Sequence, residues 1–443
     1  MRTHMRRGAV LALSAALLTG VTACSDLLDV EDPDIVTPDG LTGPSGLETL
    51  RAGAIGDFAF AYAGNGGGTE GQVLIAGMMA DEYIHSGTFT TRREFDRRDV
   101  EEDNGTATGV FSNLQRARQA LETAANSIEA VAEGSDGRIG ELRGYAGFTY
   151  VMFGENYCSG VPFSNLDETG NLVPGTPQTT DQVFQLAIDR FDAAIAGADG
   201  NEDILNMAAI GKGRALLNLG QYVEAAAAVA SVPSDFNFEM TYSIANGQEN
   251  GIYGFNVVVE RWSLANNEGV NGLPYRDLDD PRVPFGQDEE GDLGFDEVTP
   301  QWNMLKYPAR DAPADLATGA EARLIEAEKA YHDEDFSTMM DKINEVRALY
   351  GLGALADPGP GDGNRDPRVD LLFQERALTL FATSHRLGDM RRLIRQYGRR
   401  ADEVFPIGAY HKTFPDYAGD VNFPVPFDEE NNPNFTGCIN RDA

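Results

Sequence analysis

The chain has 443 residues, of which 70 are acidic and 35 are basic, so its formal net charge is −35. A surface this acidic repels nucleic acid, anionic lipid headgroups and polyanionic substrates, and we expect none of these as partners. The length suits two or three domains or one continuous helical array, and the 49 glycines and 21 prolines indicate many long connections.

Residues 1–23 have the pattern of a secretory signal peptide. Three arginines precede an apolar run, Ala9–Leu18, that is too short to span a bilayer. Small residues then lead to Cys24, and this junction resembles a bacterial lipobox, in which the cysteine thiolate takes a diacylglyceryl group. We therefore expect the mature chain to begin at Cys24, to carry fatty acyl chains such as palmitate there, and to be anchored to a membrane without crossing it.

The next stretch, 24–45, is acidic and rich in proline, which predicts a flexible tether. Beyond it, apolar residues that recur every three or four positions predict amphipathic helices at 47–62, 72–85 and 111–132. The polar stretch 86–104 between the last two is predicted to be a loop.

The following segments are expected to form pairs of antiparallel helices. The predicted helices are 143–155, 180–196, 206–219 and 222–231, with a looser pair further on at 320–331 and 336–349. In the pair 206–231, Gly213, Gly220 and Tyr222 have spacings similar to those of a tetratricopeptide repeat, where small residues let two helices approach closely. One such pair cannot bury its own apolar face, so the pairs are expected to stack on one another.

Two cysteines remain besides Cys24, namely Cys158 and Cys438. Outside the cytosol such a pair can persist as a disulfide, for which the chain-entropy model gives a stabilisation of roughly 5 kcal/mol as an upper estimate. The alternative is two separate buried thiols.

The stretch 234–313 lacks a helical period and is rich in glycine, proline and aromatic residues. We expect an irregular insert of long loops and small hairpins, with a strand candidate at Ile252–Val259. Its Trp262, Tyr275, Trp302 and Tyr307 suit two roles: stacking platforms for sugar rings or peptide side chains, or packing of the insert against the helices.

Seven short segments are similar, together and in order, to those of one protein family. They are Cys24–Asp29, Asp280–Arg282, Lys306–Pro308, Glu321–Glu328, Ile343–Arg347, Glu375–Arg392 and Phe423–Pro426 with Glu429, Asn432 and Pro433 after it. Through them the chain resembles the SusD/RagB family, surface lipoproteins that capture nutrients for TonB-dependent outer-membrane transporters.

The resemblance implies a mostly α fold of tetratricopeptide-like helical pairs with a loop-rich region and small β-hairpins. It divides the mature body into an N-terminal region, 46–233, and a C-terminal region, 234–443, with the loop-rich insert 234–313 and helices within 320–397. It also implies capture of an oligosaccharide or peptide at the outer face of the outer membrane and delivery to a SusC-like transporter. No enzymatic activity, cofactor or metal is implied.

Ligand contacts vary within this family, so we chose candidates by residue type and loop position. The candidates are Phe89, Phe95, Asn104, Trp262, Tyr275 and Trp302. Of the possible ligands, the sequence favours an oligosaccharide over a peptide. Two other classes stay open: a scaffold that binds only proteins through its helical pairs, and a lipid-anchored hydrolase that uses carboxylate pairs.

Charged residues near the C-terminus suit two roles. Glu375, His385 and Asp389 would share one helix side and form a catalytic cluster, or they would pair with nearby arginines and fix helix register. No nucleophile elbow or zinc-protease motif accompanies them, which favours the structural role. Similarly, the run Asp288–Asp292 suits a calcium loop but is more simply a solvated acidic loop.

Overall fold

The computed structural model describes residues 43–66, 68–167, 171–361, 365–413 and 415–443. The chain divides into two units, residues 1–49 and 50–443, and nearly all described residues belong to the second. The predicted signal peptide, Cys24 and most of the predicted tether lie outside the described residues. Within the described ranges, no helix has the length and apolar character to cross a bilayer.

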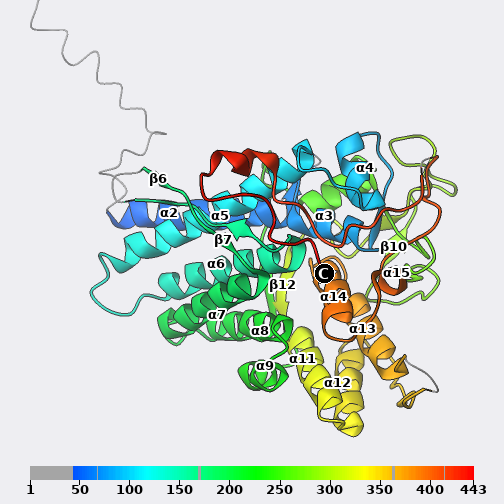
Figure 1. Cartoon of the computed structure of the whole chain (residues 1–443). Helices are drawn as coiled ribbons and strands as arrows, with labels where there is room; N and C mark the ends of the chain where they lie inside the picture. Colours follow the sequence, from blue (N-terminus) through cyan, green and yellow to red (C-terminus); the bar gives the residue numbers. More distant parts are fainter. Residues whose placement is uncertain (1–42, 67, 168–170, 362–364, 414) are drawn as a thin grey trace, which may run out of the picture. The chain divides into compact units, whose positions relative to one another are not determined.

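The unit 50–443 is mostly helical, as predicted, and Figure 1 shows its helices in chain order. The helices are α2 (Pro44–Ala63, which begins in the first unit), α3 (Gln72–Met79), α4 (Thr90–Arg97), α5 (Gly105–Glu129), α6 (Gly137–Asn156), α7 (Thr180–Gly197), α8 (Glu202–Asn218), α9 (Tyr222–Val229), α10 (Gly251–Tyr253), α11 (Gly319–His332), α12 (Phe336–Leu349), α13 (Pro367–Thr379), α14 (Arg386–Arg395) and α15 (Ala401–Val404). A π-helical turn, Gly254–Val258, follows α10, and a 3₁₀ turn, Phe427–Asn431, lies near the C-terminus.

The strands form small antiparallel pairs rather than an extended sheet. The pairs are β1 (Gly64–Asn65) with β2 (Thr69–Glu70), β3 (Tyr83–His85) with β9 (Trp262–Leu264), β4 (Val161–Pro162) with β7 (Pro177–Gln178), β5 (Asn165–Leu166) with β6 (Leu172–Val173), β8 (Asn237–Met240) with β12 (Ala314–Thr318), and β10 (Phe285–Gly286) with β11 (Asn303–Met304). Several pairs join distant parts of the chain. Thus β3 and β9 bring the loop before α4 against the loop-rich insert.

Helices α6 to α9, α11 and α12 pack in sequence, each against the next, as the repeat-like spacing predicts. Glycines allow the close approach. A Cβ at Gly147 of α6 would lie 2.6 Å from the ring of Phe191 on α7, and one at Gly213 of α8 would lie 2.7 Å from Val229 on α9. The small residues in this pattern therefore mark helix crossings.

Three local predictions were wrong. The helix predicted at 72–85 ends at Met79, because Asp81 and Glu82 turn inward and the chain enters β3. The predicted loop 86–104 contains α4, which ends at Arg98 in a left-handed conformation. The strand predicted at 252–259 is helical, because Asn250 caps α10 by accepting from the N–H groups of Ile252 and Tyr253. In this last segment the helix cap and the packing outweigh the preference of the β-branched valines for a strand.

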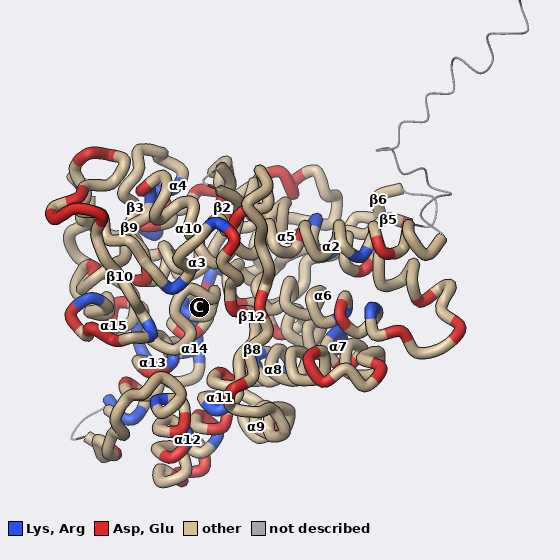
Figure 2. The backbone as a smooth tube through the Cα atoms, turned by 180° about the vertical axis from the view of Figure 1, so that it is seen from behind, with Lys and Arg blue, Asp and Glu red and all other residues tan. Residues whose placement is uncertain are grey.

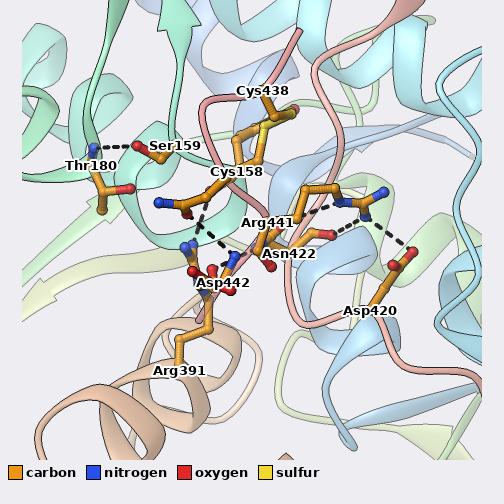
Figure 3. Close-up of a disulfide and its surroundings, with 11 residues drawn as sticks. Cys158, Ser159, Thr180, Arg391, Asp420, Asn422, Cys438, Arg441 and Asp442 are labelled. Carbon is orange, nitrogen blue, oxygen red and sulfur yellow. Dashed lines mark hydrogen bonds and ion pairs between the residues drawn. A yellow bond between two sulfur atoms is a disulfide. The ribbon is translucent and has the colours of Figure 1, made fainter.

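A disulfide joins Cys158, just after α6, to Cys438 near the C-terminus, as predicted (Figure 3). Hydrogen bonds run along both sides of it: Cys158 N–H donates to the Phe423 carbonyl at 2.9 Å, and Ile439 N–H donates to the Ser159 carbonyl at 2.7 Å. The C-terminal segment is therefore fixed to the end of α6 by covalent and backbone contacts.

Candidate functional site

The first three predicted ligand residues lie around α4, and only one is exposed. Phe89, at the N-cap of α4, is 50% exposed. Phe95 faces the core and stacks edge-to-face on Phe423 with a centroid distance of 5.0 Å. Asn104 caps α5, where its side chain accepts from the N–H groups of Thr106 and Ala107. Phe95 and Asn104 therefore have structural contacts and offer no free face to a ligand.

The loop-rich insert buries three of its four predicted platforms, Tyr307 among them. Trp262 on β9 is fully buried and meets Tyr83 edge-to-face at 6.2 Å. Tyr275 is also fully buried, with its hydroxyl 3.4 Å from Asp81. Both pack the insert onto the helices, which is the second of the two roles considered for them, and neither offers a face to a ligand as the candidate list proposed. Trp302, beside β11, stays partly exposed.

Phe89 belongs to a group of side chains that we call the aromatic–arginine cluster, composed of Phe89, Arg261, Phe295 and the buried Arg92. The guanidinium carbon of Arg261 lies 5.2 Å from the ring centroid of Phe89 and 4.2 Å from that of Phe295. Arg92 lies 4.5 Å from the Phe89 ring. Phe295 is 48% exposed, so the cluster presents two half-exposed phenyl rings with a guanidinium between them.

Local backbone geometry builds this cluster. Arg261 immediately precedes β9, and its carbonyl accepts from the N–H of Ser86, so Phe89 is held near it. Phe295 lies on a turn between Leu293 and Pro300, which form an isolated antiparallel bridge. Sequence reasoning missed Arg261 and Phe295. Their only signal was a position among Gly and Asp residues in the insert already suspected of ligand binding.

Trp302 forms a second platform. The guanidinium carbon of Arg276 lies 4.4 Å from its ring centroid, and Phe285 meets the ring edge-to-face at 5.7 Å. Arg261 and Arg276 share a property: each has a buried Nε with no hydrogen-bond partner, and neither forms an ion pair with any described residue. Flat apolar rings can stack on the apolar face of a sugar, and the terminal N–H groups of a neighbouring guanidinium, unlike its buried Nε, can donate to the sugar hydroxyls.

Acidic residues lie beside this surface, on the loops near β9 and β10 (Figure 2). Carboxylate oxygens of Glu260, Asp288 and Asp292 lie within 4.8 Å of one another. Burial, together with the negative charges of Asp292 and Asp288, raises the pKa of Glu260. Exposed acidic groups of this kind are common without an ion, and we assign no metal to them. Their charge disfavours anionic ligands here.

The suspected catalytic residues do not converge. His385 lies 2.9 Å from Glu321, Glu375 pairs with Arg282 and Arg347, and Asp389 pairs with Arg376 and Arg392. Burial raises the pKa of Asp389, but the charges and hydrogen bonds of Arg376 and Arg392 together outweigh it and hold the pKa well below its usual range. These groups hold helices together, in agreement with the structural interpretation.

A cavity of about 1120 Å³ is lined by α5, α6, α7 and the hairpins that follow α6. Its central carboxylate, Glu122, is bound by Arg143 and Arg190 and lies 3.3 Å from the Tyr150 hydroxyl. Arg118 donates to the Ser164 carbonyl. These polar groups bind one another and the aromatic Tyr150 is buried, so this cavity has less to offer a sugar than the aromatic–arginine cluster.

Comparison with known proteins identifies the fold. Surface glycan-binding protein A from Bacteroides uniformis superposes with a TM-score of 0.68 at 14% identity, over 89% of this chain and 99% of that one. A SusD superfamily protein from Bacteroides vulgatus gives 0.62 at 15% identity, over 90% and 99%. A laminarin-binding SusD-like protein gives 0.60 at 14% identity, over 90% and 99%. No family model and no curated protein matches the sequence. The SusD-like fold predicted from the seven segments is confirmed.

Proposed function

We propose that this chain, which has the SusD-like fold, is a surface glycan-binding protein that captures an oligosaccharide on the aromatic–arginine cluster. The observation that carries the proposal is the pair of half-exposed rings, Phe89 and Phe295, on either side of Arg261. Structural neighbours that are described as glycan-binding and laminarin-binding support the same ligand class.

The chemistry of the cluster suits a neutral sugar. Phenyl rings that are half exposed can cover the apolar face of a pyranose, while the terminal N–H groups of the Arg261 guanidinium can donate to hydroxyl groups. The net charge of −35 and the acidic loops nearby oppose a polyanion. Binding of this kind needs no cofactor and no covalent step.

We further propose that the chain is anchored through Cys24 to the outer membrane, facing outward, and delivers its ligand to a SusC-like TonB-dependent transporter. The lipobox-like junction and the SusD-like fold support this assignment. Residues 24–45 would then serve as the tether between lipid and body.

Affinity electrophoresis of the purified full chain in gels that contain laminarin, starch, xylan or galactomannan tests the ligand class. At least one glycan should retard the chain, and Phe89→Ala or Phe295→Ala should weaken that binding about tenfold, by loss of one stacking face. The matched control is Phe427→Ala, because Phe427 is 53% exposed but lies on the C-terminal 3₁₀ turn. Unretarded migration in every glycan would refute glycan binding. A peptide bound by the same residues would then favour the peptide-capturing alternative.

A further inference from the structure

The two rings of the aromatic–arginine cluster lie on loops distant in sequence that are packed directly together. Asp296 N–H donates to the Ser86 carbonyl at 2.9 Å, and Phe295 N–H donates to the Glu260 carbonyl at 2.8 Å. The contact is tight, since a Cβ on Gly294 would lie 2.3 Å from the Cβ of Ser86. The spacing of the rings therefore depends on how these loops are held.

A third segment bridges both loops. Lys412 Nζ donates to the Gly87 carbonyl at 2.8 Å, two residues before Phe89, and pairs with Asp296 Oδ2 at 2.6 Å, next to Phe295. Its side chain is only 14% exposed. Asp296 in turn accepts from the N–H groups of Val298 and Thr299, so the turn that carries Phe295 is organised around the carboxylate that Lys412 binds.

The segment that carries Lys412 is itself anchored on α4. The Tyr410 hydroxyl donates to Asp96 Oδ2 at 2.5 Å, and His411 Nε2 lies 2.8 Å from the same oxygen. Asp96 also accepts from the N–H of His85 on β3 at 2.8 Å. The C-terminal segment thus has a fixed attachment from which the lysine reaches both loops.

We propose that Lys412 is a positioning residue of the glycan site, setting the separation of Phe89 and Phe295 by bonding the loop of each. The inference rests on the proposed function for its consequence in binding. Its structural part stands separately, because the contacts of Lys412 are independent of which ligand the rings take.

Hydrogen exchange of the full chain tests the structural part without a ligand. In Lys412→Met, amides of Ser86, Phe295 and Asp296 should lose protection, because the two loops are no longer tied. The control is Lys306→Met: Lys306 is 16% exposed, donates to the Phe381 carbonyl at 2.8 Å and pairs with Asp315 at 3.0 Å, away from these loops. Unchanged protection of the three amides in Lys412→Met would overturn the proposal.

Binding tests the functional part, with whichever of the four gel polysaccharides retards the unaltered chain. Lys412→Met should lower the affinity for that polysaccharide about tenfold, as expected for the loss of one charge-assisted interaction. Lys412→Arg should restore most of the affinity. In a chain that already carries Phe295→Ala, Lys412→Met should lower the affinity by less than about twofold, because the lysine acts through the Phe295 ring.

Two results separate the claims. If Phe295→Ala weakens binding but Lys412→Met leaves it unchanged, the positioning role is refuted and the glycan site stands. If no polysaccharide binds the unaltered chain, the glycan site is refuted together with the role of Lys412 in it. Asp296→Asn, which removes the charge from the other side of the pair, should reproduce the Lys412→Met result; a full-affinity Asp296→Asn chain would also count against the proposal.

Discussion

Glu82 should make the protein less stable as the pH rises. The side chain is fully buried at the entrance to β3, where Oε1 accepts from the Ala382 N–H at 3.0 Å and Oε2 has no partner among the described residues. Burial, reinforced by the negative charge of Asp81, raises the pKa of Glu82 from 4.5 to about 8. The folded chain therefore holds this carboxyl group protonated at neutral pH.

The sign and size of the effect follow from proton linkage. Between pH 4.5 and 8 the unfolded chain has lost the Glu82 proton and the folded chain keeps it, so this group makes the free energy of unfolding fall by about 1.4 kcal/mol per pH unit. Its contribution is greatest below pH 4.5 and is lost as the pH rises through 8. At pH 7 this group has lowered the free energy of unfolding by about 3 kcal/mol relative to its value below pH 4.5.

Urea denaturation of Glu82→Gln at several pH values between 5 and 8 measures this contribution. Across that range the free energy of unfolding should fall less in the glutamine variant than in the unaltered chain, by about 3 kcal/mol. Glu224→Gln, on the exposed face of α9, removes one negative charge elsewhere and serves as the control. Identical slopes for Glu82→Gln and the unaltered chain would show that Glu82 is ionised in the fold, and the reasoning would fail.

Two other stability predictions follow from the fold. Replacing Cys158 and Cys438 by serine should lower the free energy of unfolding by up to about 5 kcal/mol, since the bridge closes a loop of 280 residues; denaturation with equal midpoints in oxidised and doubly substituted chains would contradict this. Gly147→Ala should destabilise by about 1–3 kcal/mol, because the new methyl group would meet Phe191 at 2.6 Å. Gly53→Ala on α2, where a Cβ meets nothing within 4 Å, should instead stabilise by up to about 1 kcal/mol, and thermal melts that rank the two variants the other way would refute the packing argument.

The helical pairs were predictable because their signals are local. Apolar periodicity marked the helices, and small residues such as Gly213 marked the crossings. Cysteine number and the expected export of the chain favoured the disulfide over two separate buried thiols. By contrast, the break between α13 and α14 has no sequence signal: Ala382 and Ser384 take the left-handed conformation at φ 58° and 63° without a glycine or proline. Because of this break, Glu375 and His385 lie on different elements and have different partners. Their spacing in the sequence predicts one shared side of a single helix instead.

The sequence indicates the region of the proposed binding surface but not its individual residues. In a stretch without period, residue type does not determine exposure, and Trp262 and Tyr275 are buried because long-range pairing with β3 and with the helices covers them. Phe295 and Arg261 become a pair only through contacts between loops, which no spacing in the sequence encodes. Tertiary contacts therefore determine which of these side chains lie together.

The attachment of the C-terminal segment also sets the order in which a new chain becomes competent. Lys412 and Cys438, made last during synthesis, complete the bracing of loops made much earlier, including the one that carries Phe89. A chain truncated before residue 412 lacks both the lysine that bonds the loops of Phe89 and Phe295 and the bridge that fixes the C-terminal segment to the end of α6. Under the proposed function, ligand capture would therefore require the segment that carries Lys412.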